Sequence, residues 1–270
     1  MKIPVNSREL AMEDTNETRE QFVETPPRFG YGLDLDDQKF ARFLTEVCAP
    51  FREFYTRWPI EPQQEGNDDF FLYNYWFESI DAEVLYCLVR HVKPKQIVEV
   101  GCGYSTRLMR RAITDGNLTT RLTCIDPEPR VEIQQYADAQ LARPVEELEP
   151  SVLADILGAN DILFIDSSHT VKAGGDVPFL YLEVVPRLRP GVLIHAHDIF
   201  VPFDYPKEWL EWGWNEQYVV NALLHDERGI EIVWPSHYMW RCHPDEVMKT
   251  IPCAYRSDSP PGSLWLRKLR

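Results

Sequence analysis

Carboxylates, histidines and glycines gather at four places along the chain, each at the end of a short apolar segment. The four clusters are Glu99-Val-Gly-Cys-Gly103, Asp126-Pro-Glu128, Asp166-Ser-Ser-His169 and His195-Ala-His197-Asp198. Carboxylates bind sugar hydroxyls and cations, histidine exchanges protons near neutral pH, and glycine lets the backbone approach a ligand closely. These residue types predict one polar site that binds a small ligand and moves a proton.

The clusters follow segments that alternate between short apolar strands and helices. Strands are predicted at 96–100, 122–126, 140–145, 162–166 and 192–197, with helices at 104–115, 147–157 and 176–187. Two later strands, 230–234 and 263–266, are expected to pair antiparallel at the sheet edge. The alternation predicts a Rossmann-like, doubly wound α/β fold with a mostly parallel sheet. Ligands bind outside the carboxyl ends of such strands, so the four clusters are expected to meet there.

The N-terminal part of the chain has a different pattern. Residues 1–35 are polar, and apolar side chains then recur with helical spacing from Phe40 to Tyr55. Residues 58–70 are rich in proline, glutamine and acids, as in a linker. We therefore expect residues 1–70 to form an N-terminal arm and helical extension, and residues 71–270 to form the Rossmann-like domain.

Composition narrows the class of protein. The 270 residues carry a net charge of -15, which disfavours a nucleic-acid partner and an anionic membrane surface. The start of the sequence has no apolar targeting segment, and no apolar run is long enough to span a bilayer. The six cysteines are scattered, as in a protein with reduced thiols. These features predict a cytoplasmic enzyme that acts on a small-molecule acceptor, and they leave open whether it forms a homo-oligomer.

The glycine loop indicates the class of cofactor. Gly101 and Gly103 allow a tight turn, and Asp126 follows at a spacing typical of a carboxylate that binds ribose hydroxyls. An exposed turn acid is the alternative for Asp126. A dinucleotide site favours a third glycine where Thr106 stands. Glu99 would repel a pyrophosphate but suits the sulfonium or amino group of a cationic cofactor. The loop therefore favours S-adenosylmethionine over NAD.

Three ordered motifs resemble a known family. They are Glu99-Val-Gly-Cys-Gly-Tyr-Ser-Thr106, Cys124-Ile-Asp126 and Leu163-Phe-Ile-Asp166. Over roughly residues 75–270 the chain resembles the class I S-adenosylmethionine-dependent methyltransferases. The resemblance implies a seven-stranded sheet with a reversed last strand. It also implies the following cofactor-binding residues: Glu99, Gly101 and Gly103 at the methionine part, Asp126 at the ribose, and Tyr104, Ser105, Thr106 and Asp166 beside them. The adenine contact, expected near 143–146, stays unassigned.

A narrower resemblance concerns the reaction. Asp166-Ser-Ser-His169 with His197-Asp198 is similar to metal-dependent O-methyltransferases that act on sugar hydroxyls. It implies that Asp166 and Asp198 bind a divalent cation, Mg²⁺ or Mn²⁺, and that His169 is the general base. His197 stands where that family has an acid, and it is the third metal ligand if a cation binds. The loss of a carboxylate weakens the case for Mg²⁺ and leaves Mn²⁺, Fe²⁺ or no metal as the alternatives. A helix-capping His169 and a purely electrostatic Asp198 are the alternatives.

Two further interpretations remain at this point. One of the alternating His195 and His197 is expected to be a core histidine. The aromatic segment 199–214 is expected to form a lid over the acceptor, or else a packing flap. The sequence thus predicts an S-adenosylmethionine-dependent O-methyltransferase. An NAD-dependent oxidoreductase and a non-catalytic binding protein with the same fold are the alternatives.

Overall fold

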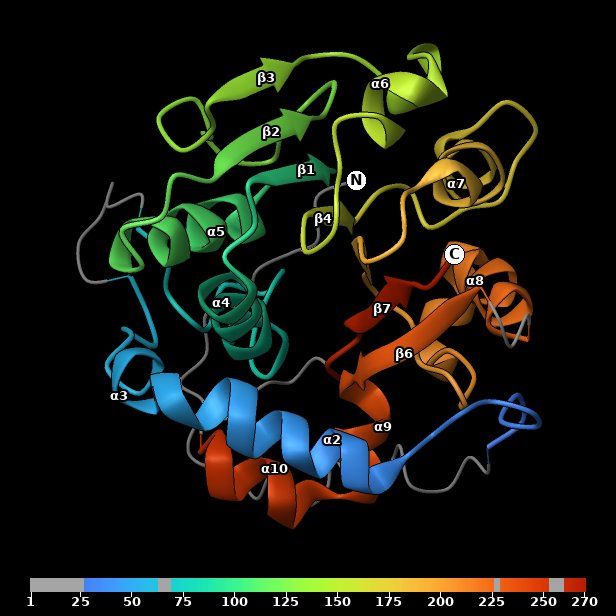
Figure 1. Cartoon of the computed structure of the whole chain (residues 1–270). Coiled ribbons are helices and arrows are strands. Elements are labelled where there is room, and N and C mark those ends of the chain that lie inside the picture. The colour runs from blue at the N-terminus through green and yellow to red at the C-terminus, as the bar shows by residue number, and fades with distance from the viewer. Residues whose placement is uncertain (1–26, 63–68, 226–228, 253–259) are drawn as a thin grey trace.

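A seven-stranded sheet forms the centre of the computed structural model, which describes residues 27–62, 69–225, 229–252 and 260–270. The strand order is β3-β2-β1-β4-β5-β7-β6 (Figure 1). The strands are β1 Gln96–Val100, β2 Arg121–Ile125, β3 Ala139–Leu141, β4 Ile162–Ile165, β5 Leu193–Ala196, β6 Ile230–Pro235 and β7 Leu264–Lys268. Strands β1 to β5 pair in parallel, whereas β7 runs antiparallel to both β5 and β6. The predicted α/β fold with a reversed last strand is confirmed.

Helices cover both faces of this sheet. Figure 1 shows α4 and α5 on one side of the strands, and α6, α7 and α8 on the other. Their bounds are α4 Asp81–Val92, α5 Tyr104–Asp115, α6 Pro150–Ala154, α7 Asp176–Pro178 and α8 Glu216–Leu224. A π-helical turn, η4 Phe179–Val184, and a 3₁₀ turn, η5 Val185–Arg187, extend α7. The doubly wound arrangement leaves the carboxyl edge of the sheet as the place where loops from both faces meet.

The register of the strands brings their carboxyl ends level. Val100 pairs with Ile125 and Ile165, and Ile165 pairs with Ala196. The backbone ladder continues one residue further, because Asp166 N–H donates to Val100 O and His197 N–H donates to Ile165 O. The residues that follow these strands therefore lie side by side.

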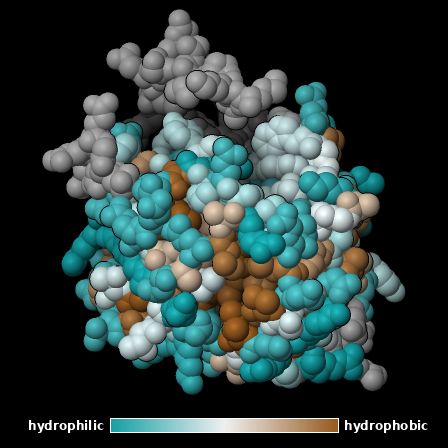
Figure 2. All heavy atoms as spheres, turned by 90° about the horizontal axis from the view of Figure 1, so that it is seen from above, coloured by the Kyte–Doolittle hydropathy of each residue, from teal (hydrophilic) through white to brown (hydrophobic). Residues whose placement is uncertain are grey.

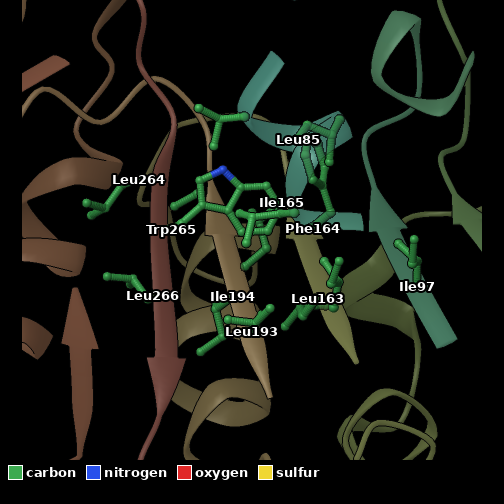
Figure 3. Close-up of a cluster of buried hydrophobic side chains, with 14 of the residues drawn as sticks. Leu85, Ile97, Leu163, Phe164, Ile165, Leu193, Ile194, Leu264, Trp265 and Leu266 are labelled. Carbon is green, nitrogen blue, oxygen red and sulfur yellow. The ribbon is translucent and has the colours of Figure 1, made fainter. Parts of the chain in front are cut away.

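Apolar side chains on both faces of the central strands form the core. Figure 3 shows residues from adjacent strands packed together, among them Phe164, Ile194 and Trp265, with Leu85 of α4 near them. All four side chains are fully buried. Strands that are buried on both faces read as continuous apolar runs, which is why these segments were recognisable in the sequence.

The N-terminal helical segment packs into the same core. It consists of α2 Asp37–Phe43, the π turn η1 Leu44–Cys48, the 3₁₀ turn η2 Ala49–Phe51 and α3 Arg52–Tyr55. Asp36 caps α2 by accepting a hydrogen bond from Lys39 N–H. Phe43 stacks on Trp234 of β6 with ring centroids 5.0 Å apart. The expected helix is present, and it is irregular where Pro50 removes a backbone donor.

The C-terminal helices α9 Ser236–Cys242 and α10 Pro244–Thr250 lie beside this segment (Figure 1). None of the described helices is both long and apolar enough to cross a bilayer. The face seen from above in Figure 2 is mostly hydrophilic, with hydrophobic side chains gathered near its middle. Val152 in α6, which lies at the top of Figure 1, and Ile156 just after it are exposed apolar side chains.

Candidate active site

A cavity of about 370 Å³ opens at the carboxyl edge of β1, β2 and β4. Its wall is formed by loops that follow these strands and by one N-terminal loop. The wall includes Trp76, Gly101–Ser105, Asp126–Glu128, Pro144–Glu146 and Asp166–Ser168. Three of the four polar clusters predicted from the sequence therefore contribute to this cavity, and the fourth lies beside it at Asp166.

Gly101 allows β1 and β4 to approach each other at the cavity. Its φ is +80°, and a Cβ atom at this position would lie 1.7 Å from the backbone oxygen of Asp166. Gly103 has extended backbone, and no heavy atom of the described residues lies within 4 Å of where its Cβ would be. Gly101 is therefore required by the fold, whereas Gly103 leaves free space at the cavity wall.

Asp126 is held in place by the glycine loop. Its Oδ2 accepts a hydrogen bond from Cys102 N–H at 2.7 Å, and its Oδ1 accepts one from Glu128 N–H at 2.8 Å. Each carboxylate oxygen has a second lone pair, so the group can still accept hydrogen bonds from a ligand. Because Asp126 is on the cavity wall, its geometry agrees with the predicted ribose contact.

Glu99, for which a cofactor contact is predicted, lies beneath the glycine loop. Glu99 is fully buried, and it is not part of the cavity wall. Its carboxylate accepts hydrogen bonds from Ser105 Oγ and Thr106 Oγ1, both at 2.6 Å, and its burial raises its pKa to about 7. Thr106 is also fully buried and accepts a hydrogen bond from Gly103 N–H. Glu99 and Thr106 therefore support the loop from below, while Tyr104 and Ser105 line the cavity.

The cavity wall also contains residues without a predicted role. Pro144, Val145 and Glu146 belong to it, in the region where an adenine contact was expected. Trp76 and Arg130 belong to it too, and the guanidinium of Arg130 lies 4.1 Å from the ring centroid of Trp76. The aromatic run before α4 was the only sequence signal for Trp76. These side chains provide apolar and planar surfaces for a heterocyclic ring.

Four predicted site residues come together next to the cavity. His169 Nε2 lies 3.3 Å from Asp166 Oδ1 and 3.5 Å from Asp198 Oδ2. His197 Nδ1 lies 3.5 Å from Asp166 Oδ1 and 3.6 Å from Asp198 Oδ2. His169 and Asp198 both have positive φ, +56° and +55°, a conformation that few residues with side chains adopt. The loops after β4 and β5 are thus bent at the two positions where these side chains enter the site.

Two buried acids outside the four clusters contact the ring nitrogens of the histidines that face away from Asp166 and Asp198. Glu216 Oε2 lies 2.8 Å from His169 Nδ1, and Asp81 Oδ2 lies 3.5 Å from His197 Nε2. Asp81 also accepts hydrogen bonds from the N–H groups of Gly262 and Ser263. Each histidine therefore has an acid behind it and faces Asp166 and Asp198 with its other ring nitrogen.

The charges in this cluster stabilise one another. Burial opposes the charge on His169, but hydrogen bonds with Asp166 and Glu216 outweigh it and raise its pKa to about 10. Burial likewise opposes the charge on His197, and the carboxylates of Asp198 and Asp166 raise its pKa well above the usual value. In return, the two histidines hold the pKa of Asp166 well below its usual range despite burial.

The chemistry of these side chains fits a divalent cation. Ligand atoms of Asp166, His169 and Asp198 lie within 4.8 Å of one another, and His197 Nδ1 lies within 3.6 Å of both carboxylates. Two carboxylates with one or two imidazoles are ligands that suit Mn²⁺ and Fe²⁺ better than Mg²⁺, which prefers oxygen donors alone. A second group of possible metal ligands, Glu99 with Cys102 and Cys124, lies below the glycine loop. Both carboxylate oxygens of Glu99 already accept hydrogen bonds there, from Ser105, Thr106 and Cys124.

His195 is the core histidine expected in this pair. Its ring stacks on Phe164 with centroids 3.8 Å apart, and its Nε2 lies 2.8 Å from Ser263 Oγ. Burial is the main reason that its pKa lies well below the usual value, so the ring is neutral. It therefore serves packing rather than chemistry.

The aromatic segment after β5 has two parts. Phe200, Val201 and Phe203 are buried, which agrees with a packing flap. The second part contains the 3₁₀ helix η6 Lys207–Trp212 and ends at Trp214, whose ring centroid lies 4.4 Å from that of His169. Trp212 packs on Trp214 and is half exposed. This second part places an aromatic surface next to the predicted base.

Comparison with known proteins identifies the segment that holds these loops. Residues 98–199 match a family described as a methyltransferase domain, whereas no curated protein sequence matches the chain. The fold is distantly similar to the methyltransferase PaMTH1 of Podospora anserina bound to SAH, with 16% identity and a TM-score of 0.47, covering 98% of this chain and 100% of that chain. It is also distantly similar to an O-methyltransferase from Bacillus cereus in complex with SAH, with 12% identity and a TM-score of 0.42, covering 89% of this chain and 94% of that chain. The segment from the glycine loop to Asp198 thus matches a methyltransferase domain, in agreement with the resemblance found in its motifs.

Proposed function

We propose that this chain, whose residues 98–199 match a methyltransferase domain, transfers the methyl group of S-adenosylmethionine to a hydroxyl group of a small molecule. Asp166 carries the proposal. Its backbone touches the glycine loop on the cavity wall, and its carboxylate contacts His169. A methyl donor in the cavity and an acceptor oxygen at His169 would therefore meet at the same residue.

The cavity suits the methyl donor. Asp126 is oriented to accept hydrogen bonds from ribose hydroxyls, and the open space at Gly103 allows the methionine part to lie against the backbone. Pro144 and Val145 form an apolar wall for the adenine ring. Glu99 would act from beneath the loop, through the side chains of Ser105 and Thr106 that it holds.

His169 is placed to act as the general base. Because its pKa is raised to about 10, His169 acts as base in the form that has released its Nε2 proton. That nitrogen then takes the proton of the acceptor hydroxyl while the oxygen attacks the methyl carbon and the carbon–sulfur bond breaks, which leaves a methyl ether and S-adenosylhomocysteine. The carboxylates of Asp166, Asp198 and Glu216 stabilise the imidazolium that results. Proximity of the two substrates supplies much of the remaining acceleration.

A divalent cation fits beside these groups. Asp166, His197 and Asp198 would hold Mn²⁺ or Mg²⁺, and the cation would supply Lewis acidity that lowers the pKa of an oxygen bound to it. The acidic surroundings favour a neutral acceptor over an anionic one, and Trp214 and Trp212 offer it an aromatic surface.

Calorimetric titration with S-adenosylhomocysteine tests the proposal. We expect micromolar binding by the wild type and at least tenfold weaker binding by Asp126→Ala, whereas Asp155→Ala, an exposed acid after α6, binds as the wild type does. Methyl transfer to a panel of neutral hydroxyl compounds is then compared with Mn²⁺ and with EDTA. Absence of S-adenosylhomocysteine binding by the folded wild type contradicts the proposal, and reduction of a nicotinamide nucleotide would favour an oxidoreductase instead.

A further inference from the structure

Glu216, the first residue of α8, is an acid with no exposed surface. A carboxylate in such a place is costly unless hydrogen bonds satisfy both of its oxygens. Its position at the start of a helix favours a negative charge but does not explain the complete burial. The surroundings of this carboxylate therefore indicate what it does.

Both oxygens of Glu216 have short contacts with side chains from other elements. Oε2 lies 2.8 Å from His169 Nδ1, and Oε1 accepts a hydrogen bond from the hydroxyl of Tyr181 at 2.6 Å. Tyr181 belongs to η4 and is buried, and burial raises the pKa of its hydroxyl well above the usual value. The hydroxyl thus stays protonated and fixes the plane of the Glu216 carboxylate from behind.

The backbone at the start of α8 holds the same histidine. The N–H groups of Asn215 and Glu216 donate to the carbonyl oxygen of His169 at 3.0 and 3.2 Å. His169 itself is held at a positive φ, and the ring of Trp214 packs against its imidazole. One short segment, Trp214–Glu216, therefore fixes both the main chain and the ring of His169.

We propose that Glu216, held by Tyr181, is the positioning residue of the proposed methyl transfer. Its carboxylate keeps the Nδ1 proton of His169, so that Nε2 is the nitrogen that faces Asp166 and Asp198 and exchanges a proton with the acceptor. The inference rests on the proposed function, since it assigns how the base of that reaction is oriented. Acids that orient a histidine through its second nitrogen act in this way in many sites.

Three variants test the role. Glu216→Leu removes both contacts, Glu216→Gln keeps an acceptor for the Nδ1 proton, and Tyr181→Phe removes only the hydroxyl behind the acid. We expect kcat to fall by about 10²–10³-fold in Glu216→Leu and by roughly tenfold in Glu216→Gln, with a smaller loss in Tyr181→Phe. The KM for S-adenosylmethionine and the affinity for S-adenosylhomocysteine should stay within about twofold of the wild type. The control Glu211→Gln changes an exposed acid of η6 and should leave all values unchanged.

Proton NMR of protein labelled with ¹⁵N-histidine gives a readout that does not need turnover. A hydrogen-bonded, buried Nδ1–H exchanges slowly with water and gives a downfield imidazole resonance, which the variant His169→Gln assigns by its loss. We expect this resonance in the wild type and in Glu216→Gln, and its absence in Glu216→Leu. The role is refuted if folded Glu216→Leu keeps the resonance or the wild-type kcat. It is also refuted if kcat and S-adenosylhomocysteine affinity fall together in both Glu216 variants, which would indicate a merely structural acid. Failure of the wild type to bind S-adenosylhomocysteine would instead contradict the proposed function, and the resonance would still report on Glu216.

Discussion

Replacing Gly101 by alanine tests the contact between the glycine loop and the end of β4. An alanine Cβ would lie 1.7 Å from the backbone oxygen and 2.7 Å from the carbonyl carbon of Asp166, so β1 and β4 must separate locally by more than an ångström. The positive φ costs an alanine about 1–2 kcal/mol, and crowding in a packed core typically adds about 1–3 kcal/mol. We therefore expect the free energy of unfolding to fall by about 2–5 kcal/mol.

Thermal unfolding followed by circular dichroism measures this loss. A fall of that size lowers Tm by roughly 5–15 °C in a protein of this length. Gly103→Ala is the matched control, because its backbone is extended and its Cβ meets no atom within 4 Å, so its Tm should stay within about 2 °C of the wild type. Since Asp166 must move, Gly101→Ala should also lose methyl transfer. This account of the loop is refuted if Gly101→Ala has the same Tm as Gly103→Ala and transfers methyl groups at the wild-type rate.

Three further predictions concern the cavity, the acid–histidine cluster beside it and a buried acid of α4. Asp126→Asn should weaken S-adenosylhomocysteine binding by about 10–100-fold in calorimetry, since a charged acceptor is lost, whereas the exposed Asp155→Asn should not. Asp198→Asn should weaken Mn²⁺ binding at least tenfold, as measured by the EPR signal of free Mn²⁺, and equal binding by both proteins would exclude Asp198 as a ligand. Burial raises the pKa of Glu83 from 4.5 to about 7, so the folded state holds a proton that the unfolded state releases between these values. This group therefore lowers the free energy of unfolding of the wild type as pH rises from about 4.5 to 7. Measured by urea unfolding, the decrease in this free energy between pH 5 and pH 8 should be smaller in Glu83→Gln than in the wild type.

The parts of the fold that were predictable are those set by local pattern. Strands such as Ile162–Ile165 are continuous apolar runs because they are buried on both faces, and each ends at a polar residue that starts a loop. The reversal of β7 was expected from the resemblance to a family, since two late strands by themselves do not reveal their direction. The strand order then places the backbones of Asp126, Asp166 and Asp198 at one edge of the sheet, independently of the direction in which their side chains point.

The direction of a side chain at a strand end was harder to predict. Glu99 belongs to β1, and its side chain lies below the glycine loop, where Ser105 and Thr106 bind it. The sequence places an acid before a glycine turn but does not say which side of the turn the carboxylate takes. The contact of Glu216 with His169 could not be predicted for a different reason. It lies 47 residues after His169 in the sequence, and only the packing of α8 against the loop after β4 brings them together.

The replacement of an acid by His197 is best understood together with Asp81. A carboxylate at position 197 would face Asp166 and Asp198 on one side and the buried Asp81 on the other, and four acids without a cation would repel one another strongly. An imidazole turns these repulsions into attractions, since one ring nitrogen faces Asp81 while the other faces the site. The site therefore has two acid–histidine pairs, Asp81–His197 and Glu216–His169, which approach Asp166 and Asp198 from different elements of the fold. Because each pair keeps one ring nitrogen toward the centre, the centre combines oxygen and nitrogen donors, and that combination favours Mn²⁺ or Fe²⁺ over Mg²⁺ wherever a cation takes part.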